Sequence, residues 1–170
     1  MAQSMVRSQL IPILMFAAAF FRSSLALAEE ADKSDKQAVQ KEFDGLQGEW
    51  KVVTAELNGR DVTDRYSKRG FTLTIQHDVW VNKDNYEQWG DAENSIIKLD
   101  PSKSPKEFDH VVTVFSDGVP ITVVTRCIYE LAGDSLKICY RDDQKDRPKQ
   151  FTSQFPHFHL LTFKRVAESK

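Results

Sequence analysis

Two histidines separated by a single residue are the clearest candidates for metal chemistry. His157 and His159 belong to a run rich in apolar and aromatic residues, 157–166, that predicts a strand. Because residues i and i+2 of a strand face the same side, both imidazoles are placed to bind one metal ion or a haem iron. His77 or His110 would complete such a site from a neighbouring strand. No acidic residue stands beside the pair in the sequence to orient the rings, and the alternative is two hydrogen-bonded or hydrated histidines at the rim of a sheet.

The length of the turn between the two cysteines decides whether they can form a disulfide. A two-residue turn at Gly133-Asp134 would place Cys127 opposite Tyr140 and Cys139 opposite Ile128. The two sulfur atoms would then point to opposite sides of the sheet, so we expect two free thiols. A three-residue bulged turn would instead set the two cysteines opposite each other and permit a disulfide.

No combination of side chains predicts an enzyme. The cluster of Asp142, Asp143 and Asp146 lacks the glycine and the distal glutamate of a calcium-binding EF-hand loop, which favours a solvated turn. Ser102 and Ser104 lie in a loop without a histidine and an acid at positions that suggest a triad. We therefore expect a non-catalytic protein without a cofactor.

The first 28 residues have the features of a signal peptide. Arg7 supplies a positive charge, residues 10–21 are apolar but too few to span a membrane, and Ala26-Leu27-Ala28 is a typical cleavage site. The alternatives are an uncleaved anchor and a buried helix. Cleavage would give a periplasmic or secreted protein, and no later apolar run is long enough to span a membrane.

The charge of the remaining chain argues against a nucleic-acid partner. The full chain has 170 residues with 23 basic and 25 acidic side chains, and the signal-like segment holds two of the basic ones and no acid. The mature protein would therefore be acidic, whereas nucleic-acid binding needs a basic stripe. Its length suits one domain.

The period of the apolar residues changes from helical to extended near Trp50. Val39, Phe43 and Leu46 recur at helical spacing, which predicts a short helix over 35–43 that ends at Gly45. About eight short strands separated by turn residues follow, a pattern typical of an all-β antiparallel barrel or sandwich. The expected strands are 50–57, 71–76, 79–83, 95–99, 108–115, 121–131, 135–140 and 157–166, with a further paired segment at 86–89.

The sequence 46–53 suggests how such a barrel would close. Gly48 would let the chain bend tightly into the first strand. Trp50 would then plug the barrel floor, and a basic side chain of the last strand, from Lys164-Arg165, would stack on its indole ring.

Several segments in a fixed order resemble a known family. They are 46–53, 99–106, 128–131, 133–140, Arg147-Pro148 with Phe151, and Lys164-Arg165. Together they resemble a small exported domain of unknown function that is best known from planctomycete bacteria and is lipocalin-like. The resemblance implies a lipocalin-like barrel over 46–168, after a signal peptide (1–28) and a segment with a short helix (29–45), and it implies no activity. Members often have a small or aliphatic residue where Cys127 stands.

The expected function depends on where the aromatic residues lie in the barrel. In a wide barrel they would line a ligand cavity, whereas in a narrow one they would fill it. We expect binding of a small apolar or amphipathic molecule, with Trp80, Trp89 and Tyr129 in the lining. One alternative is a filled barrel that serves as a structural or protein-interaction module, marked by an exposed apolar patch or an unprotected edge strand. The other is metal or haem binding through His157 and His159.

Overall fold

A computed structural model describes residues 33–83, 88–89 and 95–167. The chain divides into two compact units, 1–37 and 38–170, and the second contains all the strands described below. The expected signal peptide (1–28) lies outside the described residues. So do the side chain of Trp89 and the first two residues of the expected segment 86–89.

The N-terminal helix is longer than the sequence predicted. It runs over 33–46 and does not end at Gly45, which packs closely against the barrel. A Cβ atom at Gly45 would lie 2.9 Å from Leu131 Cδ2. The next residue, Leu46, is buried in the core, and Gly48 then reverses the chain with a φ of 111°. None of the helices in the described part of the chain is both long and apolar enough to cross a membrane.

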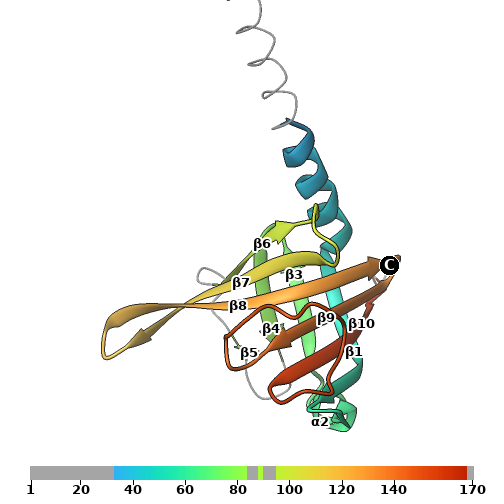
Figure 1. The fold of residues 1–170 in the computed structure, drawn as a ribbon, viewed down its shortest axis with the longest axis vertical. Helices are drawn as coiled ribbons and strands as arrows, with labels where there is room; N and C mark the ends of the chain where they lie inside the picture. The colour runs from blue at the N-terminus through green and yellow to red at the C-terminus, as the bar shows by residue number, and fades with distance from the viewer. Residues whose placement is uncertain (1–32, 84–87, 90–94, 168–170) are drawn as a thin grey trace, which may run out of the picture. The chain divides into compact units, whose positions relative to one another are not determined.

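Eight of the described strands close into an antiparallel barrel, as predicted (Figure 1). Closure comes from β1, the first strand, which pairs with β10, the last. Around the barrel from β1 the order is β3, β4, β6, β7, β8, β9 and β10. The strand bounds are β1 Gly48–Leu57, β3 Thr72–Gln76, β4 Val79–Lys83, β6 Ser95–Asp100, β7 Lys106–Ser116, β8 Val119–Ala132, β9 Ser135–Arg141 and β10 Phe158–Arg165. Three short elements complete the set: β2 Arg60–Asp61, α2 Thr63–Lys68 and β5 Gln88–Trp89.

The β8–β9 hairpin has the register that the two-residue turn predicted. Cys127 pairs with Tyr140, Cys139 pairs with Ile128, and both thiols are free. Cys127 faces the barrel interior together with Ile138 and Tyr140. Cys139 faces outward, where its Sγ donates a hydrogen bond to the Thr152 carbonyl at 3.3 Å beneath the loop before β10.

Arg165 and Trp50 close the floor of the barrel, as the sequence indicated. The guanidinium carbon of Arg165 lies 4.1 Å from the centre of the Trp50 ring. The same guanidinium donates hydrogen bonds to the carbonyls of Gly45, at 2.7 Å, and Gln47, and to Asp134 Oδ1 at 3.1 Å. The indole nitrogen of Trp50, which is fully buried, donates to the Leu46 carbonyl at 2.9 Å. One arginine thus joins the first strand, the last strand and the end of the helix.

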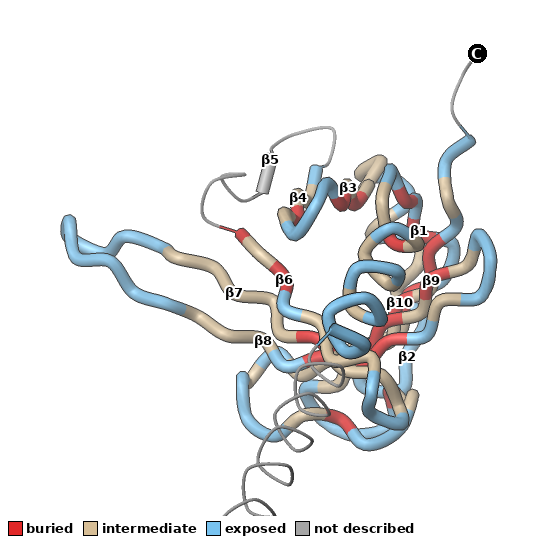
Figure 2. Tube along the Cα trace, turned by 90° about the horizontal axis from the view of Figure 1, so that it is seen from above, coloured by how far each residue is buried: buried red, intermediate tan, exposed pale blue. Residues whose placement is uncertain are grey.

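The β7–β8 hairpin extends well beyond the rest of the barrel (Figures 1 and 2). β6 pairs with β7 only as far as Val112, and β9 pairs with β8 only from Cys127 onward. The part between them carries exposed apolar side chains, and its tip is coloured as exposed in Figure 2. Phe115 is 65% exposed and Val119 is 60% exposed.

We predict that Arg165→Met lowers the free energy of unfolding by about 2–4 kcal/mol. It removes the cation–π contact and leaves the helix carbonyls without their charged donor. Urea unfolding measures the change, and Lys164→Met is the matched control, because its side chain is exposed on the neighbouring position. The floor assignment is wrong if Arg165→Met and Lys164→Met unfold at the same urea concentration.

Candidate functional site

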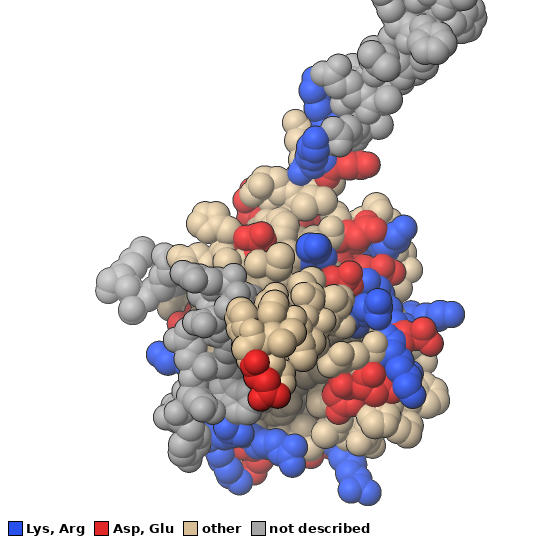
Figure 3. Space-filling view, turned by 90° about the vertical axis from the view of Figure 1, so that its left-hand side faces the viewer, with Lys and Arg blue, Asp and Glu red and all other residues tan. Residues whose placement is uncertain are grey.

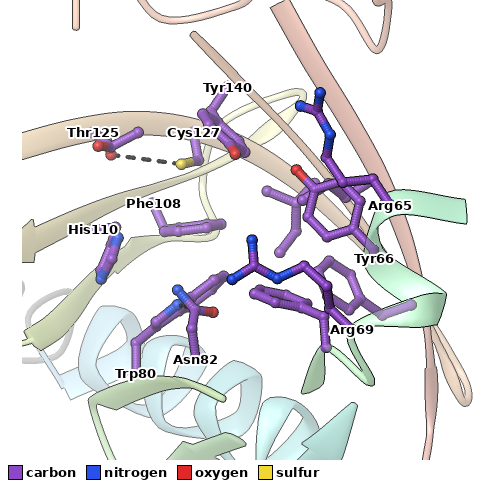
Figure 4. A pocket seen from close by; sticks show the side chains of 14 residues that line it. Arg65, Tyr66, Arg69, Trp80, Asn82, Phe108, His110, Thr125, Cys127 and Tyr140 are labelled. Carbon is purple, nitrogen blue, oxygen red and sulfur yellow. Dashed lines mark hydrogen bonds between the residues drawn. The ribbon is translucent and has the colours of Figure 1, made fainter. Parts of the chain in front are cut away.

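A cavity of about 380 Å³ occupies the end of the barrel that α2 borders (Figure 4). Its volume falls within the range of small-molecule sites, roughly 300–1,000 Å³. The walls are mainly apolar and aromatic, as small-molecule sites usually are. They are formed by Phe71, Trp80, Phe108, Ile138, Leu161 and Phe163.

The other end of the barrel is filled by side chains. A second small hollow between Leu46, Ile97 and Leu136 has no room for a water molecule. Trp80, Phe108 and Ile138 line both spaces and separate them. The barrel is therefore solid at the floor and hollow at the α2 end, so neither the filled nor the open alternative describes it fully.

The structure places the expected lining residues at different depths. Trp80 lines the cavity, where its ring lies against Phe108 with centres 5.6 Å apart. Tyr129 lies below the cavity in the filled half, and its hydroxyl donates to Glu42 Oε2 at 3.2 Å. The side chain of Trp89 lies outside the described residues. Contact of these residues with a ligand stays a prediction.

The polar groups inside the cavity are kept neutral by burial. His110 shares a 2.8 Å hydrogen bond with Ser95, and burial lowers its pKa to about 4. Burial also raises the pKa of the Cys127 thiol and of the Tyr140 hydroxyl, since both would be charged if they lost a proton. At neutral pH these groups offer hydrogen bonds without net charge.

The charged side chains of the lining come from α2 and the residue after it. Arg65 and Arg69 are four positions apart, a spacing that puts helical side chains on one face. Two hydrogen bonds attach the start of this segment to β1. The Ala55 amide donates to Thr63 Oγ1 at 2.9 Å, and the Val62 amide donates to the Ala55 carbonyl at 2.8 Å. In Figure 4 the Arg69 side chain reaches toward Trp80 and Phe108, whereas the guanidinium of Arg65 points away from them.

Sequence reasoning missed most of this lining. Residues 61–69 are almost entirely polar, and α2 forms within them. Two signals were present. Tyr66 and Phe71 are aromatic residues in an otherwise polar stretch, and they pack edge to face with ring centres 5.3 Å apart. The alternation of strand residues from Phe108 also places His110 on the inner face.

The two histidines at 157 and 159 share a carboxylate that sequence spacing did not reveal. His157 Nδ1 lies 2.8 Å from one oxygen of Asp142, and His159 Nε2 lies 3.0 Å from the other. Hydrogen bonds from the two histidines lower the pKa of Asp142, and the bond from His159 contributes more than the bond from His157. Asp142 is remote in sequence and reaches the pair because β9 and β10 are neighbours, which corrects the inference that no acid orients the rings.

This cluster is arranged for hydrogen bonding. The ring of His159 stacks on Tyr140 at 4.6 Å with an angle of 9° between the planes. Among the described residues, no group of three histidine, cysteine or acidic side chains has the arrangement of a metal site. The metal and haem alternative therefore gains no support from this cluster.

Cys127 and His110 both line the cavity but do not contact each other as a nucleophile and a base would. The thiol donates to the Thr125 carbonyl at 3.5 Å, and the imidazole bonds to Ser95. A catalytic thiol also needs a lowered pKa, whereas that of Cys127 is raised. The geometry of this pair suits packing and hydrogen bonding.

Comparisons of the chain with protein-family models, curated proteins and solved structures found no match. The fold is a closed antiparallel barrel of eight strands, and the resemblance to the planctomycete domain family stays a prediction.

We predict that acid destabilises the protein through His110. Because its pKa is about 4 in the folded protein and 6.5 as the ordinary value, the unfolded chain binds more protons between these pH values. The stability is complete above pH 6.5 and is lost as the pH falls toward 4, by up to roughly 3 kcal/mol.

Urea unfolding at a series of pH values measures this effect. His110→Gln should flatten the loss between pH 6.5 and 4, because glutamine does not titrate. His77→Asn, at an exposed turn, is the control and should keep the slope of the wild type. Equal slopes for the wild type and His110→Gln would rule out His110 as the source.

Proposed function

We propose that this protein is an exported, non-catalytic carrier whose barrel binds a small apolar or amphipathic molecule. The observation that carries the proposal is the cavity of about 380 Å³, with mainly apolar walls, in a barrel whose other half is filled. Removing apolar ligand surface from water would drive binding, at about 25 cal/mol per Å². Export is inferred from the signal-like residues 1–28.

The separation of a solid floor from a hollow end supports this function. A barrel that served only as a scaffold would be expected to fill both ends, because empty apolar space costs stability. The neutral polar groups of His110, Thr125 and Tyr140 would orient a ligand, since sites of this kind combine apolar walls with a few placed polar groups.

A second candidate function, protein interaction, is favoured by the β7–β8 hairpin. Val114 and Ile121 are paired on one of its faces and are 43% and 45% exposed. Between residues 113 and 125 the only charged residue is Asp117, and Figure 3 shows a largely uncharged surface with one acidic side chain on it. Exposed apolar surface of this kind marks interaction sites.

The backbone of the hairpin favours a protein over a lipid bilayer as its partner. No strand in the described ranges pairs with the outer edge of residues 119–125 in β8. A bilayer cannot satisfy an open strand edge, whereas a second strand can. A second copy of this chain offers the same edge and the same apolar face, so we propose self-association through this hairpin.

We predict that filling the cavity weakens the binding of a neutral apolar dye, N-phenyl-1-naphthylamine. Thr125→Phe should lower the affinity at least tenfold, because the new ring occupies space at the cavity wall. Thr54→Phe is the matched control, since Thr54 is an exposed threonine of β1 outside the lining. Fluorescence titration measures both. The carrier proposal fails if the wild type shows no saturable binding, or if both variants bind like it.

We predict that the protein self-associates and that Ile121→Lys prevents this, because a buried unpaired charge at the interface is costly. Sedimentation velocity over a concentration series measures the association. Thr54→Lys, which adds the same charge at an exposed position of β1, should leave it intact. A wild type that stays monomeric at the highest soluble concentration contradicts self-association through the hairpin.

A further inference from the structure

Two tyrosine hydroxyls of the cavity have no hydrogen-bond partner in the described part of the chain. Tyr66 comes from α2 and Tyr140 from β9, and both side chains belong to the lining. In Figure 4 the hydroxyls of both residues point into the cavity. A buried hydroxyl without a partner costs stability. Both groups are therefore placed to bind a polar atom of a ligand.

Packing fixes the direction of both hydroxyls. The ring of Tyr140 stacks on His159, with ring centres 4.6 Å apart, and His159 is in turn held by Asp142. The ring of Tyr66 packs edge to face on Phe71 with centres 5.3 Å apart, and the Phe71 amide donates to the Tyr66 carbonyl at 3.1 Å. A donor whose ring is already held in place loses little conformational freedom when a ligand binds.

Both hydroxyls keep their protons at physiological pH and can donate hydrogen bonds. Burial raises the pKa of Tyr66, and the smaller opposing effect of Arg65 does not reverse this change. Burial also raises the pKa of Tyr140, and the neighbouring Tyr66 adds to the increase. A phenolic O–H donates more strongly than an aliphatic hydroxyl, because the ring withdraws electron density from the oxygen.

Two acceptors of the lining are already occupied. Asn82 Oδ1 accepts a hydrogen bond from the Trp80 indole nitrogen at 2.9 Å, and the Thr125 carbonyl accepts one from Cys127 Sγ at 3.5 Å. The two tyrosines offer donors, which a ligand must meet with an acceptor. A carbonyl oxygen has two lone pairs, so a single atom can accept from both hydroxyls. An ionised group would lose its hydration among mainly apolar walls, which two neutral donors compensate only in part.

We propose that the ligand is a compact apolar molecule with one carbonyl oxygen, which accepts hydrogen bonds from the hydroxyls of Tyr66 and Tyr140. Its apolar part lies against Trp80 and Phe108. The ligand is compact because the cavity volume, about 380 Å³, lies near the lower end of the range for small-molecule sites. This inference rests on the proposed carrier function and narrows its ligand class.

Displacement of N-phenyl-1-naphthylamine by 1-tetralone and tetralin tests the carbonyl, because tetralin has a methylene group in its place. Tyr66→Phe and Tyr140→Phe should each lower the ratio of tetralone affinity to tetralin affinity by about threefold or more, and the double variant at least tenfold, since tetralin makes neither hydrogen bond. These variants keep the packed rings. Tyr129→Phe, which removes a hydroxyl bound to Glu42 outside the cavity, is the matched control and should keep the wild-type ratio.

The infrared C=O stretch of bound 1-tetralone gives an independent readout. With the wild type it should lie at a lower wavenumber than in an apolar solvent, because hydrogen bonds weaken the C=O bond. In the double variant it should move back toward the value in that solvent. An unchanged stretch in the double variant contradicts the assignment.

Each outcome separates this inference from the carrier function. If both compounds displace the dye and the variants at Tyr66 and Tyr140 keep the wild-type ratio, the carbonyl site is wrong and the carrier function stands. If tetralin-1-carboxylate displaces the dye at lower concentrations than 1-tetralone, the neutral ligand class is wrong. If neither the dye nor any of the three compounds binds, the carrier function itself falls.

Discussion

The contact of the Arg165 guanidinium with the Trp50 ring is the interaction on which the barrel depends. The same guanidinium binds the carbonyls of Gly45 and Gln47, which lie at the end of the N-terminal helix. Helix ends leave carbonyls without partners, and an arginine satisfies them while complementing the helix dipole. Because β1 and β10 meet at this point, one side chain links closure of the barrel to coverage of its floor. The hollow part of the barrel is therefore confined to the α2 end.

The size of the inward side chains decides where the barrel is hollow. An eight-stranded barrel is just wide enough for side chains to fill it. At the floor, Trp50 and Tyr129 do so, and both are almost completely buried. Nearer to α2, the inner positions of β8 are Thr125 and Cys127, which are small and leave space. The small residues at this wall thus leave a cavity in a barrel that is otherwise filled.

The loop between β9 and β10 stabilises the cavity wall that β7 and β8 form. Arg147 donates to the carbonyls of Phe108, at 2.8 Å, and Cys127, at 2.6 Å, which are register partners on β7 and β8. It also pairs with Asp109 and Glu107. The cavity wall is thereby held in place directly below the point where the hairpin leaves the barrel. Ligand binding and protein interaction would then use two parts of the same pair of strands, one covered, the other extended and exposed.

The sequence by itself determined the strands and their local pairing. Alternating residues and turn residues predicted an all-β barrel or sandwich and the free thiols of Cys127 and Cys139, because these follow from period and turn length. The residues near the two ends of the strand-forming region predicted the contact between Trp50 and a basic residue of the last strand. Only the tertiary structure decided which aromatic side chains fill the barrel and which leave a cavity, so Trp80 lines it while Tyr129 does not. It likewise brought Asp142 to the histidines and Arg69 to the cavity. These contacts join residues from different elements, and their distances are set by how strands tilt and pack around the barrel, which no spacing within one segment encodes.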